Sequence, residues 1–104
     1  MIKIKIARNE GKIILISMQG HAEYDQYGKD IVCSAASTII IGGINAIAKL
    51  GFISFISYNV DAGNVEVKIN NTDINELQVI LETLVVQFMS IEESYPKYIQ
   101  VQEV

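Results

Sequence analysis

One cysteine, Cys33, and one histidine, His21, stand twelve residues apart in this chain. A thiol nucleophile needs a base to take its proton, and imidazole is the usual base near neutral pH. The two residues lie at opposite ends of one polar segment, so their types and spacing are those of a Cys–His dyad. The spacing alone also fits a simpler interpretation, in which Cys33 is a small buried apolar residue and His21 is not catalytic.

The composition limits what else the chain could be. With 104 residues, half of them hydrophobic, it is expected to form one domain over residues 1–104 with a substantial core. One cysteine excludes an internal disulfide, and one cysteine with one histidine argues against a structural zinc site. We expect no cofactor. A net charge of −4 argues against nucleic acid as a direct partner and suits a basic protein partner.

The N-terminus does not resemble a signal peptide, because residues 2–6 alternate isoleucine with lysine as a strand does. Residues 31–48 carry no formal charge and reach the short limit for a membrane span. They also contain serines, glycines and an asparagine, which favour a buried helix of a soluble domain. We therefore expect a cytoplasmic protein without a membrane partner.

Hydrophobic periodicity predicts the order ββαββαβ, an α+β fold with an antiparallel-rich sheet and both helices packed on one face. The predicted strands are residues 2–8, 12–19, 52–59, about 65–69 and 97–102, and the predicted helices are 33–50 and 73–94. Asp73 and Glu76 have the spacing of a capping box at the start of the second helix. The turn before the fourth strand is predicted at residues 61–63.

The two predicted helices differ in their apolar surface. The second has a single stripe, which indicates one buried face: Ile74, Leu77, Leu81, Leu84, Phe88 and Ile91. The first is apolar nearly all round, and one sheet face with one partner helix would leave part of it uncovered. We therefore expect a homodimer that buries the remainder. The pair Gly42–Gly43 predicts close approach of a neighbouring backbone, or a kink.

These elements place His21 just past the second strand and Cys33 at the start of the first helix. The eleven residues between them can fold back, so the two side chains could meet at one edge of the sheet. A helix N-terminus offers unbonded N–H groups and a positive dipole end, which both favour a thiolate. The N–H of Cys33 or Ser34 could then bind the oxyanion of a tetrahedral intermediate.

Two neighbouring polar residues each have two interpretations. Asp30 could be the N-cap of the first helix, or it could orient His21 as the third member of a triad. Ser37 lies one helical turn after Cys33 and could hydrogen-bond near the site or bond a backbone carbonyl.

The segment from Ala22 to Val32 is long for a connection in a compact domain, which is typical of lids and binding loops. Tyr24 and Tyr27 have large amphipathic faces suited to holding an extended peptide, and Gly28 is a candidate hinge. We expect this loop to be loose in the free protein and ordered by substrate. A fixed, well-packed loop with surface tyrosines is the alternative.

The residues from Gly20 to Ser37 resemble a known signature. Gly20-His21-Ala22, then Gly28, Asp30-Ile31-Val32-Cys33, Ala35 and Ser37 are similar to the pattern G-H-A…G-x-D-I-V-C-x-A-x-S of the bacterial ribosomal-processing cysteine protease Prp family. The chain length, the element order and the opening hairpin are similar too.

The resemblance implies an endopeptidase that removes a short N-terminal extension from ribosomal protein L twenty-seven of the large subunit. It implies Cys33 as nucleophile, His21 as base, Asp30 and Ser37 as supporting residues, and a homodimer. The chain departs from the pattern at Ser34, where alanine is usual, and at residues 23–27, which are bulkier and more acidic. That second difference concerns substrate preference more than chemistry.

Two other classes of function remain open from the residues themselves. One is a non-catalytic ribosome-assembly or binding module. The other is a thiol redox sensor, in which Cys33 is reactive without His21 as its base.

Overall fold

The computed structural model describes residues 1–20 and 27–104, except for the side chains of residues 27–30. The strands are β1 (Ile2–Asn9), β2 (Lys12–Gln19), β3 (Ile56–Asp61), β4 (Asn64–Ile69) and β5 (Ile99–Glu103). The helices are α1 (Tyr27–Lys49) and α2 (Asn75–Ser94), and a short 3-10 helix, η1 (Ile53–Phe55), precedes β3. This is the predicted order ββαββαβ.

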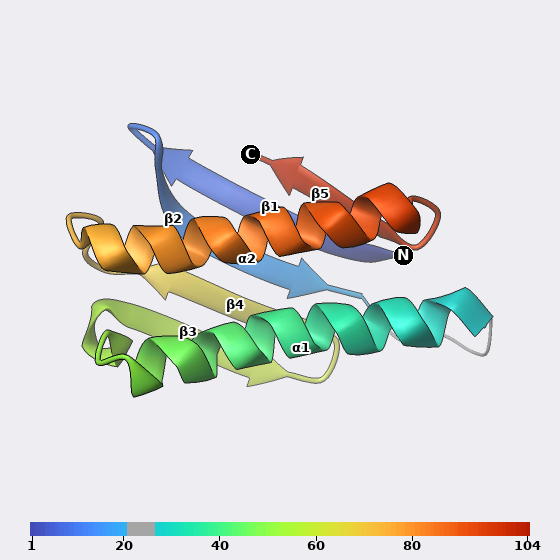
Figure 1. The fold of residues 1–104 in the computed structure, drawn as a ribbon, viewed down its shortest axis with the longest axis horizontal. Coiled ribbons are helices and arrows are strands. Elements are labelled where there is room, and N and C mark those ends of the chain that lie inside the picture. Colours follow the sequence, from blue (N-terminus) through green and yellow to red (C-terminus); the bar gives the residue numbers. More distant parts are fainter. Residues whose placement is uncertain (21–26) are drawn as a thin grey trace.

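The five strands form one sheet in the order β3-β4-β2-β1-β5, and both long helices cover the same face (Figure 1). The β1–β2, β2–β4 and β3–β4 pairs are antiparallel, and only β1–β5 is parallel. The predicted α+β class is therefore confirmed. The β2–β4 register pairs Gln19 with Asn64, so the end of β2 lies beside the turn between β3 and β4.

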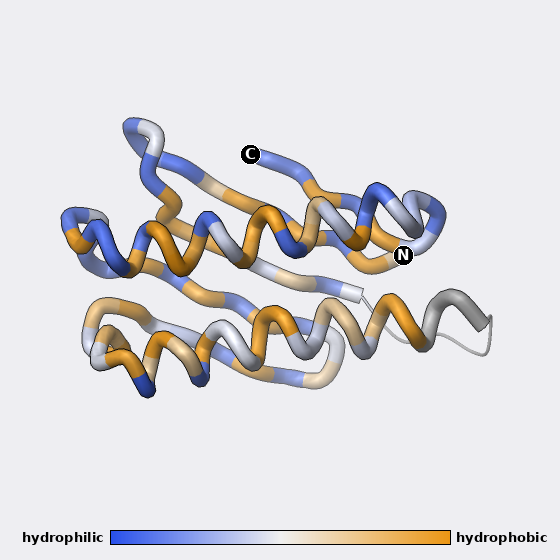
Figure 2. Tube along the Cα trace, viewed as in Figure 1, coloured by the Kyte–Doolittle hydropathy of each residue, from blue (hydrophilic) through white to orange (hydrophobic). Residues whose placement is uncertain are grey.

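The core lies between the sheet and the helices, because each strand turns alternate apolar side chains toward them. In β1, Ile2, Ile4 and Ile6 are buried while Lys3 is exposed. Along the chain trace, apolar and polar segments alternate in the same way (Figure 2). The predicted stripe of α2 is confirmed: Leu77, Leu81, Leu84 and Phe88 are buried, with Ile74 and Ile91 packed against them.

The capping box predicted for α2 is wrong. The helix begins at Asn75 after Ile74, whose backbone is extended and whose side chain cannot cap. The Asp73 N–H instead donates to Asn71 Oδ1 at 2.9 Å, so the chain turns before the helix starts. A hydrogen bond from the backbone to the Asn71 side chain therefore replaces the predicted capping box just before this helix.

The start predicted for the first helix is also wrong, since α1 begins at Tyr27 and Cys33 lies in its second turn. Gly28 and the β-branched Ile31 and Val32 favour helix weakly. Val32 is nevertheless fully buried, and it begins the stripe that α1 turns toward the sheet: Val32, Ala36, Ile40, Ile44 and Ile47. Tertiary packing therefore stabilises turns that local propensity does not predict.

Helix α1 is long and apolar enough to cross a membrane, with a mean hydropathy of 1.9 over residues 31–49 and 33% of that window buried. The core helix of a soluble protein has the same composition. Here α1 packs against the sheet and α2. A Cβ at Gly43 would lie 2.5 Å from Leu84 Cδ1, while one at Gly42 would meet nothing within 4 Å. The close approach expected at this glycine pair thus involves a side chain, not a backbone.

Several strand boundaries differ from prediction, most of all at the starts of β3 and β5. The third strand begins at Ile56 instead of residue 52, because the Phe55 N–H donates to Phe52 O at 3.0 Å and forms η1. The following turn contains only Ala62 and Gly63, whose φ of +76° suits glycine. The last strand begins at Ile99, after a turn between residues 95 and 98.

Candidate active site

Cys33 lines a cleft of about 390 Å³ at one end of the sheet. Its walls come from the end of β2, one face of α1 and the β3–β4 turn. The lining residues are Met18, Gly20, Cys33, Ser37, Ile41, Val60, Asp61, Ala62, Gly63, Asn64 and Val65. A nucleophile, a hydroxyl and several backbone polar groups therefore share one partly enclosed space.

The α1 wall of the cleft consists of Cys33, Ser37 and Ile41, which lie four residues apart and so stack on one helix face. Cys33 is half-buried and packs against the core, as Ile41 does. The helix fixes the Cβ position of Cys33, while its partial exposure leaves the sulfur open to the cleft.

The opposite wall includes Gly20, the residue that directly precedes His21. The Gly20 N–H donates to Gly63 O at 3.0 Å, which ties the end of β2 to the β3–β4 turn. Gly20 has φ +140°, and a Cβ there would lie 2.8 Å from Met1 O. Only glycine fits at this position, so the chain entering residue 21 is held in one place on the cleft wall.

The structure brings together only some of the residues singled out from the sequence. Cys33, Ser37 and Gly20 share the cleft. Ser34 is exposed, is not part of the lining, and its carbonyl accepts a hydrogen bond from Thr38 Oγ1 at 2.8 Å. His21 and Tyr24 lie outside the described residues.

The early start of α1 overturns two expectations about its N-terminus. Asp30 lies inside the first turn, so it is not the N-cap. The free N–H groups of a helix belong to its first four residues. Those of Cys33 and Ser34 come later, where each N–H donates to the carbonyl four residues earlier. Neither is available to an oxyanion, and the dipole effect weakens beyond the first turn.

The same finding shortens the loop expected between the two residues of the dyad. Residues 27–32 are helical, so Tyr27 and Gly28 belong to α1, and Gly28 is not a loop hinge. An unstructured segment of eleven residues is therefore wrong. The part of the expected lid that precedes Tyr27 lies outside the described residues.

Sequence reasoning missed the wall formed by the β3–β4 turn, including Asp61 and Asn64. Asp61 is the one formally charged residue of the described lining. Asn64 Oδ1 is buried and accepts no hydrogen bond from the described part of the chain. No local signal marks these residues, because they reach the cleft only through the pairing of β2 with β4.

The cleft at Cys33 is smaller than another cavity in the described part of the structure. A cavity of about 830 Å³ lies at the C-terminal end of α2, lined by Met1, Met89, Pro96 and neighbouring residues, and it contains no cysteine. We place the candidate active site at Cys33 because catalysis requires a reactive side chain, and Cys33 supplies a nucleophilic thiol. Across residues 1–20 and 27–104, no three His, Cys, Asp or Glu side chains gather as metal ligands would.

The sequence model of the cysteine protease Prp family matches residues 1–100. The chain belongs to the Prp family. It is therefore a cysteine peptidase by family. The ribosomal processing cysteine protease Prp of Staphylococcus aureus is 38% identical over 104 residues, which cover 96% of each chain. The Prp of Bacillus subtilis is 28% identical over 107 residues, covering 97% of this chain and 96% of its own.

Solved Prp structures share this fold over their whole length. The S. aureus protease in complex with a substrate peptide superposes with a TM-score of 0.91 at 35% identity, covering 100% of both chains. The same protease with a covalently linked product peptide gives 0.87 at 36% identity, again over 100% of both. The resemblance inferred from the motif is thus confirmed, and relatives of this chain are ribosomal processing proteases.

Proposed function

We propose that this protein is a cysteine endopeptidase that removes a short N-terminal extension from ribosomal protein L twenty-seven of the bacterial large subunit. The observation that carries the proposal is the cleft in which Cys33 faces Gly20, the anchored residue next to His21. The relatives named ribosomal processing proteases support the substrate class.

In the proposed reaction, His21 takes the proton of the Cys33 thiol, and the thiolate attacks the carbonyl carbon of the scissile peptide bond. The tetrahedral intermediate collapses to a thioester as His21 protonates the leaving amine. Water then hydrolyses the thioester and regenerates the thiol. A relative that holds a covalently linked product peptide is consistent with nucleophilic catalysis.

Supporting roles follow from position. Ser37 is one turn from Cys33 on the same wall, so its hydroxyl can donate to a substrate oxygen there. We assign Asp30, which precedes Cys33 by one helical turn, to the orientation of His21. Gly20 sets the path of the chain into His21, whereas the exposed Ser34 has no assigned contact. Tyr24 and Tyr27 are assigned to substrate contact, since they lie in the segment that joins base and nucleophile.

The proposed cellular setting is the cytoplasm, where the ribosomal substrate is made. We also propose a homodimer, because the two helices keep large apolar side chains at the surface: Ile31 of α1 and Val79, Val86 and Met89 of α2 are each more than 40% exposed, as is Leu50, which directly follows α1. Sedimentation of the purified protein across micromolar concentrations should show a dimer. Finding only monomer would contradict this.

The function is tested by incubating the purified protein with the full-length ribosomal protein and measuring intact masses. The expected product lacks the N-terminal extension. Cys33→Ala should lower the rate by more than roughly a thousandfold while its circular dichroism stays unchanged. Undiminished processing by this variant would exclude Cys33 as nucleophile, and intact substrate with the wild-type protein would exclude the function.

A further inference from the structure

The sheet has two edge strands, β3 and β5 (Figure 1). The two differ in whether their outward backbone groups have hydrogen-bond partners. A free edge presents unpaired backbone groups that can bind another strand, so proteins usually block it. In β5, the outward N–H of Val101 donates to Glu92 Oε2 at 2.7 Å. A carboxylate from α2 therefore occupies that edge.

The outward backbone groups of β3 can be identified from its register. The Asn70 N–H donates to Phe55 O at 2.7 Å, so residues 55 and 70 occupy a hydrogen-bonded position of the ladder, although the Phe55 N–H itself donates to Phe52 O. Bonded and unbonded pairs alternate along an antiparallel ladder. Residues 57, 59 and 61 therefore bond toward β4, while Tyr58 and Val60 direct their N–H and C=O groups outward. No group of the described residues bonds to these outward positions.

The β3 edge also lacks most of the usual blocking devices, since its one charged residue, Asp61, stands at the end of the strand. Its pairing with β4 is continuous, whereas β1–β2 has a bulge at Ala7/Arg8. The strand Ile56–Asp61 contains no lysine or proline. Tyr58 and Val60 are 53% and 50% exposed, although they share a strand face with the buried Ile56. An unblocked edge with apolar side chains is prone to pair with another chain.

This edge continues into the site. Val60 and Asp61, at the end of β3, line the cleft that contains Cys33. A strand added beside Tyr58 and Val60 would therefore run directly to the nucleophile. Hydrogen bonds to the β3 backbone would hold an extended peptide in a fixed register whatever its side chains. A fixed register would place one peptide bond of the substrate at the cleft.

We infer that the substrate polypeptide binds as an additional strand on the edge of β3, hydrogen-bonded to Tyr58 and Val60. The inference rests on the proposed function and specifies its substrate class: an extended segment with apolar residues at alternate positions. Those side chains pack on Tyr58 and Val60, on the helix side of the sheet. The intervening side chains lie near the polar Ser57, Asn59 and Asp61, and Asp61 disfavours an acidic residue at the cleft.

The test uses the wild-type protein and a set of synthetic peptides that span the N-terminal extension and the scissile bond. Each peptide is N-methylated at a single residue, and that residue is never next to the scissile bond. N-methylation removes a single donor and adds bulk. We expect KM to rise about tenfold at every second residue and to change little between them, with kcat nearly constant. A pattern without this alternation would overturn the inference.

A protein variant provides the complementary test. In Tyr58→Pro the lost N–H points away from β4, so an edge strand tolerates it. We expect KM to rise about tenfold, and less in Tyr58→Thr, which keeps the N–H. If Tyr58→Pro fails to fold, the peptide series still decides. If it dissociates a dimer without changing KM, the edge binds a second copy and the inference fails. Absence of cleavage by the wild type would instead overturn the proposed function, and the inference with it.

Discussion

Gly43 of α1 lies directly against Leu84 of α2. A Cβ on Gly43 would be 2.5 Å from Leu84 Cδ1, in a helix pair whose facing residues are buried. The preceding glycine, Gly42, is exposed and would meet nothing within 4 Å. Two adjacent glycines thus have different roles: one permits close packing of the helices, and the other has no packing role.

Alanine substitutions separate these roles. Gly42→Ala should stabilise the protein by about 0.5–1 kcal/mol, because alanine loses less backbone entropy in a helix. Gly43→Ala gains the same propensity but overpacks the helix contact at a cost of about 1–3 kcal/mol, so the net effect is destabilising. Urea unfolding of both variants measures the difference. Equal stabilisation by both would show that α2 moves away without cost.

Reactivity of Cys33 distinguishes the proposed dyad from the other classes of function. Iodoacetamide alkylation of the wild type near pH 7 should be fast, and His21→Ala should slow it by roughly tenfold or more, since no base then holds the thiol proton. Slow alkylation of both proteins would favour a binding module. Fast alkylation that survives His21→Ala would favour a redox sensor. Circular dichroism of the variant provides the control for folding.

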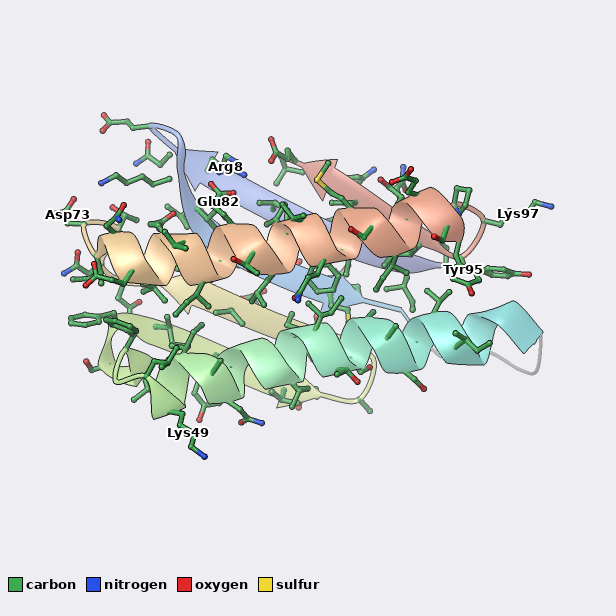
Figure 3. The ribbon with its side chains drawn as sticks, viewed as in Figure 1. Arg8, Lys49, Asp73, Glu82, Tyr95 and Lys97 are labelled. Atoms are coloured by element: carbon green, nitrogen blue, oxygen red, sulfur yellow. The ribbon has the colours of Figure 1, made fainter. Side chains whose placement is uncertain are left out.

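The ion pair between Arg8 of β1 and Glu82 of α2 predicts a pH dependence of stability (Figure 3). Arg8 bonds both Glu82 oxygens, at 2.6 and 2.7 Å, and these hydrogen bonds hold the pKa of Glu82 below its ordinary 4.5 despite some desolvation. A depressed carboxyl pKa contributes stability above the unfolded-state value, and this contribution is lost as pH falls through the folded-state value.

The Arg8–Glu82 coupling should therefore be about 0.5–1 kcal/mol at pH 7, because both side chains are partly exposed, and should disappear well below pH 4.5. A double-mutant cycle with Arg8→Met and Glu82→Gln, measured by urea unfolding at several pH values, gives the coupling directly. A coupling that does not change with pH would contradict an ionic origin.

Gln78 joins α2 to the start of β2 through a buried side chain. Its Nε2 donates to Ile13 O and its Oε1 accepts from the Ile13 N–H, both at 2.9 Å. Gln78→Leu would leave two buried backbone groups of Ile13 unbonded, and we expect a loss of about 2 kcal/mol. Gln87→Leu, at an exposed glutamine of the same helix, should change stability by less than about 0.5 kcal/mol. Thermal unfolding compares the two, and similar losses would show that the Ile13 bonds contribute little.

The amino-acid sequence by itself determined the element order, the buried stripe of α2 and the family. These features depend on patterns that are local along the chain. Apolar periodicity identifies strands and helices, and the motif from Gly20 to Ser37 is contiguous. The same locality explains why residue type and spacing are enough to single out Cys33 and His21.

Only the tertiary structure decided where α1 begins and what faces Cys33. Burial of Val32 stabilises helical turns that Gly28 and the β-branched residues disfavour locally, so the helix begins at Tyr27 and not at Cys33. The pairing of Gln19 with Asn64 brings Asp61 and Asn64 to the cleft. Strand order depends on contacts between residues far apart in the chain, and local periodicity carries no information about which strands pair.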